Sequence, residues 1–100
     1  MPIKHIVLMK FKADTTVEAL EKATANLLAL KDKVPGVQEI SFGPTFTTDR
    51  SNGYTHALVV DLDDKASLET YGPHPEHQAV VAADLKPNFE GPPLAMDYEF

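Results

Sequence analysis

Apolar residues recur at every second position along residues 3–12, and this period of two predicts a β-strand. One side of the predicted strand carries four residues: His5, Val7, Met9 and Phe11. The opposite side is also apolar at its centre, where it carries Ile6 and Leu8. A strand that has one side in water carries polar residues on that side. We therefore expect Ile6 and Leu8 to be covered by a surface of their own.

A helix is predicted after residue 15. Thr15 to Glu18 forms a capping box, in which the Thr15 hydroxyl is expected to accept a hydrogen bond from the first helical turn and Glu18 to reach back. Apolar residues then recur every three or four positions and form one stripe: Leu20, Ala23, Leu27, Leu30 and Val34. Pro35 and Gly36 are expected to end the helix, because proline disfavours helical backbone in the residue before it.

The rest of the chain predicts three strands and two helical segments. The strands are residues 37–46, residues 54–62 after a polar loop, and residues 94–100. Gly43 and Pro44 interrupt the first of these, which we expect to be bulged or at a sheet edge. Asp63 and Asp64 are expected to cap a short helix over residues 65–71, and Pro75 to begin a helix that runs to residue 85.

The order strand, helix, strand, strand, broken helix, strand is typical of the α+β class with a ferredoxin-like fold. This fold is a β-α-β-β-α-β arrangement with a four-stranded antiparallel sheet and helices on one side. The other side of the sheet, which includes Ile6 and Leu8, then has no cover within the chain. Two copies that pack these sheet faces together would bury both, so the pattern predicts a homodimer.

Length and charge restrict the class of protein. The 100 residues suit one domain, residues 1–100. The formal net charge of −6 argues against nucleic acid and anionic membranes as partners. The chain has no cysteine, which excludes disulfides, thiolate metal sites and cysteine nucleophiles, and residues 1–5 lack the apolar core of a signal peptide. No apolar run approaches the ~20 residues that a membrane-spanning helix needs, and a cytoplasmic protein is expected.

Five segments resemble the stress-responsive A/B barrel (Dabb) domain family, in matching order and spacing. They are Lys4-His5-Ile6-Val7-Leu8-Met9-Lys10-Phe11-Lys12, Val34-Pro35-Gly36-Val37, Gly53-Tyr54-Thr55-His56-Ala57, Tyr71-Gly72-Pro73-His74-Pro75-Glu76-His77 and Asp97-Tyr98. The resemblance implies a dimeric α+β barrel. The family includes stress proteins and a plant polyketide cyclase that performs an intramolecular aldol condensation, and the matching positions imply catalytic roles for His77 and Tyr71 and a place in the pocket for His5. Thr24 and Leu27 stand where the cyclase has aromatic residues, which implies a ligand of another shape.

His77 is the first candidate catalytic residue. It falls in the first turn of the helix that begins at Pro75, where the helix dipole disfavours imidazolium, so we expect a neutral ring that can accept a proton. Its spacing from Val81 and Leu85 directs it toward the sheet. Asp97 on the last strand is expected to accept the second ring N–H of His77 and so orient it. The alternative is that His77 only caps and packs, with its N–H satisfied by Asp97.

Tyr71 and His5 complete the predicted site. A phenol at residue 71 can donate to a carbonyl oxygen that gains negative charge, although the same residue can simply fill the space beneath a broken helix. His5 is either a pocket residue or a satisfied core histidine, and His56 and His74 are expected to be structural. The substrate-binding pocket is expected between helices and sheet, lined by Val7, Met9, Phe11, Leu27, Leu58 and Val81.

Neither a metal nor another cofactor is expected. His74, Glu76 and His77 are close in sequence, but a cap residue and a first-turn residue need not converge on one ion. No nucleotide-binding glycine motif occurs, and only the backbone carbonyls of the Val34–Val37 turn remain as an open cation site. Two hypotheses follow: a cofactor-independent lyase or cyclase acting on a small hydrophobic carbonyl compound, or a non-enzymatic stress-responsive homodimer that binds a small ligand. A cavity of at least ~300 Å³ that reaches both His77 and Tyr71 would favour the enzyme.

Overall fold

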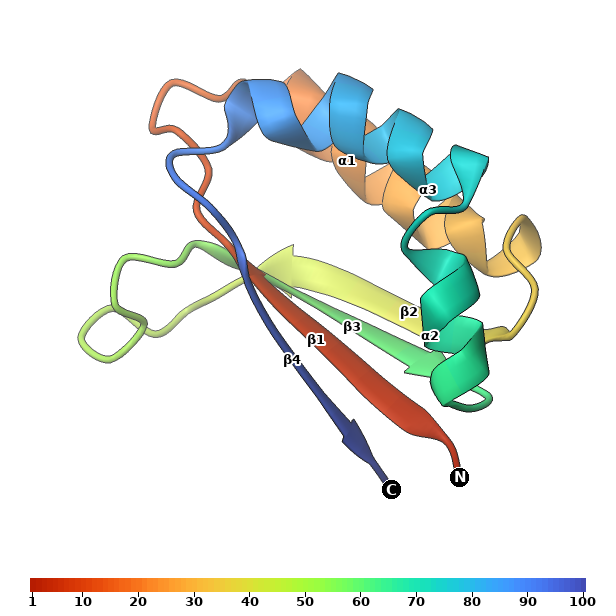
Figure 1. The fold of residues 1–100 in the computed structure, drawn as a ribbon. Helices are drawn as coiled ribbons and strands as arrows, with labels where there is room; N and C mark the ends of the chain where they lie inside the picture. Colours follow the sequence, from red (N-terminus) through yellow and green to blue (C-terminus); the bar gives the residue numbers. More distant parts are fainter.

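The computed structural model describes residues 1–100 and contains one four-stranded antiparallel sheet with helices on one face (Figure 1). The strands are β1 (Ile3–Met9), β2 (Val37–Pro44), β3 (His56–Leu62) and β4 (Leu94–Glu99), in the order β2-β3-β1-β4. The helices are α1 (Val17–Ala29), α2 (Lys65–Tyr71) and α3 (Pro75–Val80). The predicted ferredoxin-like β-α-β-β-α-β arrangement is confirmed.

The strands follow the predicted pattern, but each is shorter than predicted. β1 ends at Met9 rather than at residue 12, and Phe11 forms an isolated bridge with Phe89 instead. β2 ends at Pro44, two residues before the predicted end, and it stays paired with β3 through Gly43 and Pro44, so these residues do not interrupt it. Its register with β3 shifts instead between Val37 and Glu39. β2 and β4 are the edge strands of the sheet. The central strands β1 and β3 therefore each have a hydrogen-bonded strand along both edges.

The first helix begins one residue later than the capping box indicated. Thr16, not Thr15, is the N-cap, and its hydroxyl accepts a hydrogen bond from the backbone N–H of Ala19 at 3.1 Å. The Thr15 hydroxyl is buried without a hydrogen-bond partner. Two adjacent threonines can both cap a helix, and only the backbone path into α1 selects between them. After α1 the chain continues as a 3₁₀ turn over Leu30–Asp32.

The second helical region is broken twice. Asp64 caps α2 by accepting from the N–H of Ser67, and α2 ends at Tyr71 as predicted. The predicted single helix over residues 75–85 is α-helical only over α3 and then widens into a π-turn over Val81–Leu85. Single π-turns inside helices are uncommon and often lie at functional sites. This one continues alongside α1 above the sheet (Figure 1).

The hydrophobic core lies between the helices and the inner face of the sheet. Its most deeply buried large side chains are Ile3, Leu27, Leu30, Val60, Leu62 and Tyr71. One charged residue, Asp84 in the π-turn, is also buried, and its carboxylate accepts a hydrogen bond from the Asn26 side chain on α1 at 2.8 Å. This bond ties the π-turn to the first helix.

The outer face of the sheet carries apolar residues that no helix covers. The strand registers place on this face Ile6, Leu8, Val59, Leu94, Met96 and Tyr98, which we call the open sheet face. Met96 is 74% exposed and Tyr98 is 52% exposed. Ile6 and Leu8 are half-buried by their neighbours. None of the helices has the length and the apolar character that crossing a bilayer requires.

Candidate active site

An apolar cavity of about 200 Å³ lies between the sheet and the helical layer. Its walls include five of the six residues expected to line a pocket, together with two histidines: Val7, Met9, Leu27, Leu58, Val81, His5 and His77. Phe11, the sixth, does not line it, because its ring packs edge-on against Phe89, whose side chain forms the wall instead. The cavity is smaller than the ~300 Å³ typical of ligand pockets, and Tyr71 is not part of its lining.

His77 reaches the cavity from α3, and the backbone of the turn before α3 fixes its ring. Its Nδ1 lies 2.8 Å from the carbonyl oxygen of Gly72, which also accepts a hydrogen bond from the Gln78 side chain. A carbonyl oxygen only accepts, so Nδ1 of His77 must carry the hydrogen. In the neutral ring the lone pair is then on Nε2.

Burial decides the charge of His77. Loss of hydration in the partly buried site lowers the pKa of His77, the hydrogen bond to Gly72 acts in the opposite direction, and charge on His5 and His74 lowers the pKa further. The ring is therefore neutral at pH 7, as expected, and burial is the largest cause of its lowered pKa.

Asp97 pairs with His5 and not with His77, which corrects the expected arrangement. The register of β1 and β4 sets His5 directly opposite Asp97, and Nδ1 of His5 lies 2.5 Å from the Asp97 carboxylate. His77 already uses its Nδ1 on Gly72. The His5 side chain is 14% exposed and that of Asp97 is 39% exposed, so the carboxylate is the solvent-facing end of the pair.

Tyr71 lies behind the two histidines. Its ring centroid is 4.4 Å from that of His77 and 5.7 Å from that of His5, and the residue is 1% exposed. Burial raises the pKa of Tyr71 to about 12, so the phenol keeps its proton at pH 7. The hydroxyl is buried without a hydrogen-bond partner. The structure thus brings the four predicted residues His77, Tyr71, His5 and Asp97 together, with Tyr71 as the inner member.

The two other histidines lie outside the cavity lining. His56 stacks on Phe42, with ring centroids 5.3 Å apart, and burial lowers the pKa of His56. His74 is the N-cap of α3, where its Nδ1 accepts from the N–H of Glu76. No group of three or more metal-ligating side chains converges in the structure. In the Val34–Val37 turn, the carbonyls of Val34 and Gly36 accept backbone hydrogen bonds.

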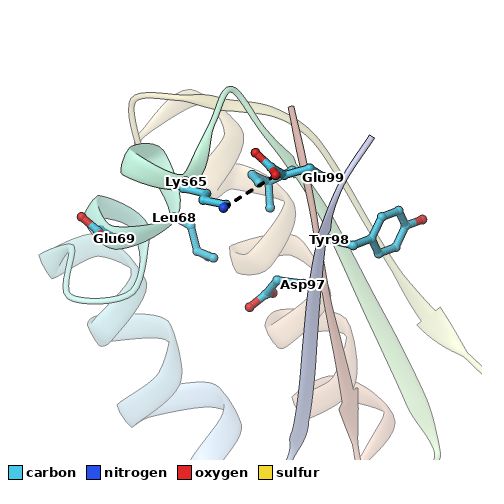
Figure 2. Close-up of a pocket in the computed structure, with 7 residues that line it drawn as sticks. Lys65, Leu68, Glu69, Asp97, Tyr98 and Glu99 are labelled. Carbon is cyan, nitrogen blue, oxygen red and sulfur yellow. Dashed lines mark ion pairs between the residues drawn. The ribbon is translucent and has the colours of Figure 1, made fainter. Parts of the chain in front are cut away.

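A second hollow lies on the solvent side of Asp97. This α2/β4 groove, of about 450 Å³, is lined by Ile3, Lys65, Leu68, Glu69, Asp97, Tyr98 and Glu99. Figure 2 shows the Asp97 carboxylate on the helix side of β4 and the Tyr98 ring on the opposite side. Lys65 and Glu99 form an ion pair of 3.6 Å across the groove. Asp97 therefore contacts both an open groove and His5.

Sequence patterns gave no role to the backbone carbonyl of Gly72, nor to three residues that close the cavity: Phe89, Pro93 and Ala95. A backbone carbonyl has no side-chain signature. The segment that contains Phe89 and Pro93 reads as a proline- and glycine-rich connection rather than as part of an element. Only the folded arrangement shows that this connection forms a cavity wall.

The chain is similar in sequence and in structure to several known proteins. Olivetolic acid cyclase from Cannabis sativa is 27% identical over 99 residues, which are 98% of this chain and 96% of that protein. A stress-response A/B barrel domain-containing protein from Arabidopsis thaliana is 31% identical over 80 residues, 80% of this chain and 71% of that protein. A dimeric ferredoxin-like protein of unknown function from Thermobifida fusca superposes with a TM-score of 0.83 at 26% identity, covering 100% of this chain and 92% of that chain.

The family model of the stress responsive A/B barrel domain matches residues 3–100. This range includes every strand and helix of the fold and all four residues of the candidate site. This chain therefore belongs to the stress responsive A/B barrel domain family.

Proposed function

We propose that this protein is a cofactor-independent lyase or cyclase that acts on a small hydrophobic, polyketide-like carbonyl compound by histidine acid/base catalysis. One observation carries the proposal: His77 lines the apolar cavity while its Nδ1 is tied to the Gly72 carbonyl, which leaves Nε2 as the basic atom. The similarity to olivetolic acid cyclase over nearly the whole chain supports cyclase chemistry.

The proposed reaction is an intramolecular aldol condensation. Nε2 of His77 takes a proton from the carbon next to a carbonyl, and the C–H electron pair becomes an enolate. The enolate carbon then forms a C–C bond to a second carbonyl carbon of the same molecule. The resulting alkoxide takes the proton back from His77, which gives a cyclic alcohol. The hydroxyl then leaves with a proton from the neighbouring carbon as water, and a C=C double bond forms in the ring. The base is restored, so no cofactor takes part.

Tyr71, His5 and Asp97 have supporting roles in this proposal. The protonated Tyr71 phenol donates toward the oxygen that gains charge, after a small movement that brings its hydroxyl from behind the histidines into the cavity. His5 lines the same cavity from β1, and Asp97 orients the His5 ring through its Nδ1.

The cavity favours a short apolar substrate. Its wall is aliphatic apart from the two histidines and Phe89, and its volume of about 200 Å³ leaves room only for a small molecule. Leu27 is part of this wall. By the resemblance, it stands at a position where the plant cyclase has an aromatic residue. The net charge of −6 favours a neutral small molecule over nucleic acid or an anionic membrane as the partner.

We also propose that two copies pair through the open sheet face. Met96, Tyr98 and Leu94 are each at least half exposed in the single chain, next to Ile6 and Leu8. A contiguous apolar face of this kind marks an interaction site. The similar structure from Thermobifida fusca is described as dimeric.

The test of activity uses diacetylacetone, a short linear triketone whose aldol closure with loss of one water gives orcinol. We expect orcinol to form faster with the protein than in buffer, and His77→Gln to remove about 100-fold or more of that acceleration. His74→Asn is the matched control, because it keeps a capping side chain at α3 and lies outside the cavity. Equal rates for the wild type and a folded His77→Gln variant would refute the proposed role of His77.

A second candidate function is binding without conversion, as in a stress-responsive homodimer. The small cavity and the position of Tyr71 behind its wall favour this alternative. Calorimetric titration with methyl pentyl ketone separates the two functions when it is combined with the orcinol assay. Binding of the ketone without formation of orcinol supports a ligand-binding protein, whereas orcinol formation that depends on His77 supports the enzyme.

A further inference from the structure

The two histidines that line the cavity differ in the group that hydrogen-bonds to their Nδ1 atom. Nδ1 of His77 donates to the Gly72 carbonyl oxygen, which accepts a hydrogen bond but cannot take up the proton. Nδ1 of His5 faces the Asp97 carboxylate at 2.5 Å, and a carboxylate can take up a proton. His77 therefore has no route for protons except back into the cavity, whereas His5 has a second side.

The Asp97 carboxylate connects that second side to water. His5 lines the apolar cavity, and Asp97 lines the separate α2/β4 groove. The Asp97 side chain is 39% exposed, and that of His5 is 14% exposed. The carboxylate projects on the helix side of β4 (Figure 2). The hydrogen bond between the two residues is thus a direct link between an apolar cavity and a solvent-open groove.

We propose that His5 and Asp97 form a proton conduit that exchanges protons between the catalytic cavity and the α2/β4 groove. This inference rests on the proposed function of His77. In the outward half, Nε2 of His5 takes a proton from the cavity, Nδ1 passes its own proton to Asp97, and Asp97 releases it to water. In the inward half, Asp97 takes a proton from water, returns it to Nδ1, and Nε2 releases its proton into the cavity. Together the halves restore every group.

The groove surroundings suit this role. Besides Asp97 the groove carries Glu69, Glu99 and Lys65, and Lys65 pairs with Glu99 at 3.6 Å. The other titratable groups that face His5 are Tyr71 and His77. Tyr71 keeps its proton because its pKa is about 12, and Nδ1 of His77 is held by Gly72, so Asp97 is the neighbour that hydrogen-bonds to Nδ1 of His5.

The experiment follows exchange of deuterium from D₂O into the carbon next to the carbonyl of methyl pentyl ketone, by proton NMR. We expect the wild type to catalyse exchange and Asp97→Asn to slow it by about 10- to 100-fold, because an amide cannot relay a proton. Added acetate should restore the rate of Asp97→Asn, since a small acid can enter the groove, and leave the wild-type rate unchanged. Glu69→Gln is the matched control in the same groove, because it leaves the Lys65–Glu99 ion pair in place, and it should exchange at the wild-type rate.

The outcomes separate the conduit from the function on which it rests. Slow exchange in Asp97→Asn that acetate does not restore would mean that Asp97 only positions His5, and the conduit would be refuted. Wild-type exchange in Asp97→Asn would refute the conduit and leave the role of His77 intact. Absence of catalysed exchange in the wild type itself would overturn the proposed function and the conduit together. Circular dichroism establishes that each variant is folded before its rate is compared.

Discussion

The Nδ1 atom of His77 lies 2.8 Å from the carbonyl oxygen of Gly72, five residues earlier in the chain. The two residues stand on either side of the turn that separates α2 from α3. A break in the helical layer thus supplies the free carbonyl that an unbroken helix would have used for its own hydrogen bonding. The broken helix is therefore the feature that fixes the tautomer of the candidate catalytic base.

The pH dependence of stability should report the buried histidines. Burial lowers the pKa values of His77 and His56 from the ordinary 6.5, so the unfolded chain binds more protons than the folded chain as the pH falls. The free energy of unfolding is then expected to be highest above pH 6.5 and to fall as the pH is lowered through the folded pKa values. Urea unfolding at about pH 7.5, 6.5 and 5.5 measures this. His77→Gln should show a smaller fall, and an unchanged slope would contradict the prediction.

Removing the Tyr71 hydroxyl should affect stability and activity in opposite directions. Tyr71→Phe keeps the ring contacts with both histidines but removes a buried hydroxyl that has no hydrogen-bond partner. We expect the free energy of unfolding to rise by about 1 kcal/mol, because the cost of burying that group disappears. Orcinol formation should fall. Thermal unfolding and the cyclisation assay on one preparation measure both, and a clear loss of stability would show that the hydroxyl has a partner.

The bond between Asn26 and Asp84 should contribute more to stability than the nearby ion pair. Asn26→Ala leaves the Asp84 carboxylate, 6% exposed, without its 2.8 Å donor, at an expected cost of about 1–3 kcal/mol in the free energy of unfolding. Lys22→Ala is the matched control: Lys22 is 3.9 Å from the same carboxylate and 70% exposed, so about 0–1 kcal/mol is expected. Equal losses in urea unfolding would contradict this ranking.

The fold was largely predictable from local patterns. The alternation in β1 and β3, the Asp64 cap and the stop after Tyr71 act over a few residues, and each led to the correct element. Where two residues carried the same local signal, the sequence could not show which of them plays the role. Thr15 and Thr16 are both good caps, and the π-turn over residues 81–85 depends on packing against α1, including the Asn26–Asp84 bond.

The site depended more on long-range pairing. The sequence pointed to His77, Tyr71, His5 and Asp97, but it paired Asp97 with the wrong histidine. The pairing with His5 follows from the register between the first and last strands, residues 92 positions apart, which no local pattern specifies. The Gly72 carbonyl was missed because a backbone atom is the same in every residue. A list of reactive side chains was therefore predictable, and their hydrogen-bond partners were not.

A charge on the open sheet face should disrupt the proposed dimer. Met96→Lys places an ammonium on that face in the middle of strand β4, where burial in a dimer would remove its hydration. Light scattering after size-exclusion chromatography should give twice the chain mass for the wild type and a single chain mass for Met96→Lys. Val17→Lys, at a 66% exposed apolar residue on α1, is the control and should stay dimeric. A monomeric wild type would refute the proposed pairing.

The central claim is that His77 is neutral at pH 7 with its lone pair on Nε2, and imidazole ¹⁵N NMR tests this most directly. The long-range ¹H–¹⁵N spectrum distinguishes the two neutral tautomers from the imidazolium ion, and the His77→Gln spectrum assigns the signal. The geometry predicts protonated Nδ1 and unprotonated Nε2 for residue 77. A doubly protonated ring at pH 7, or a hydrogen on Nε2 instead of Nδ1, would contradict the account.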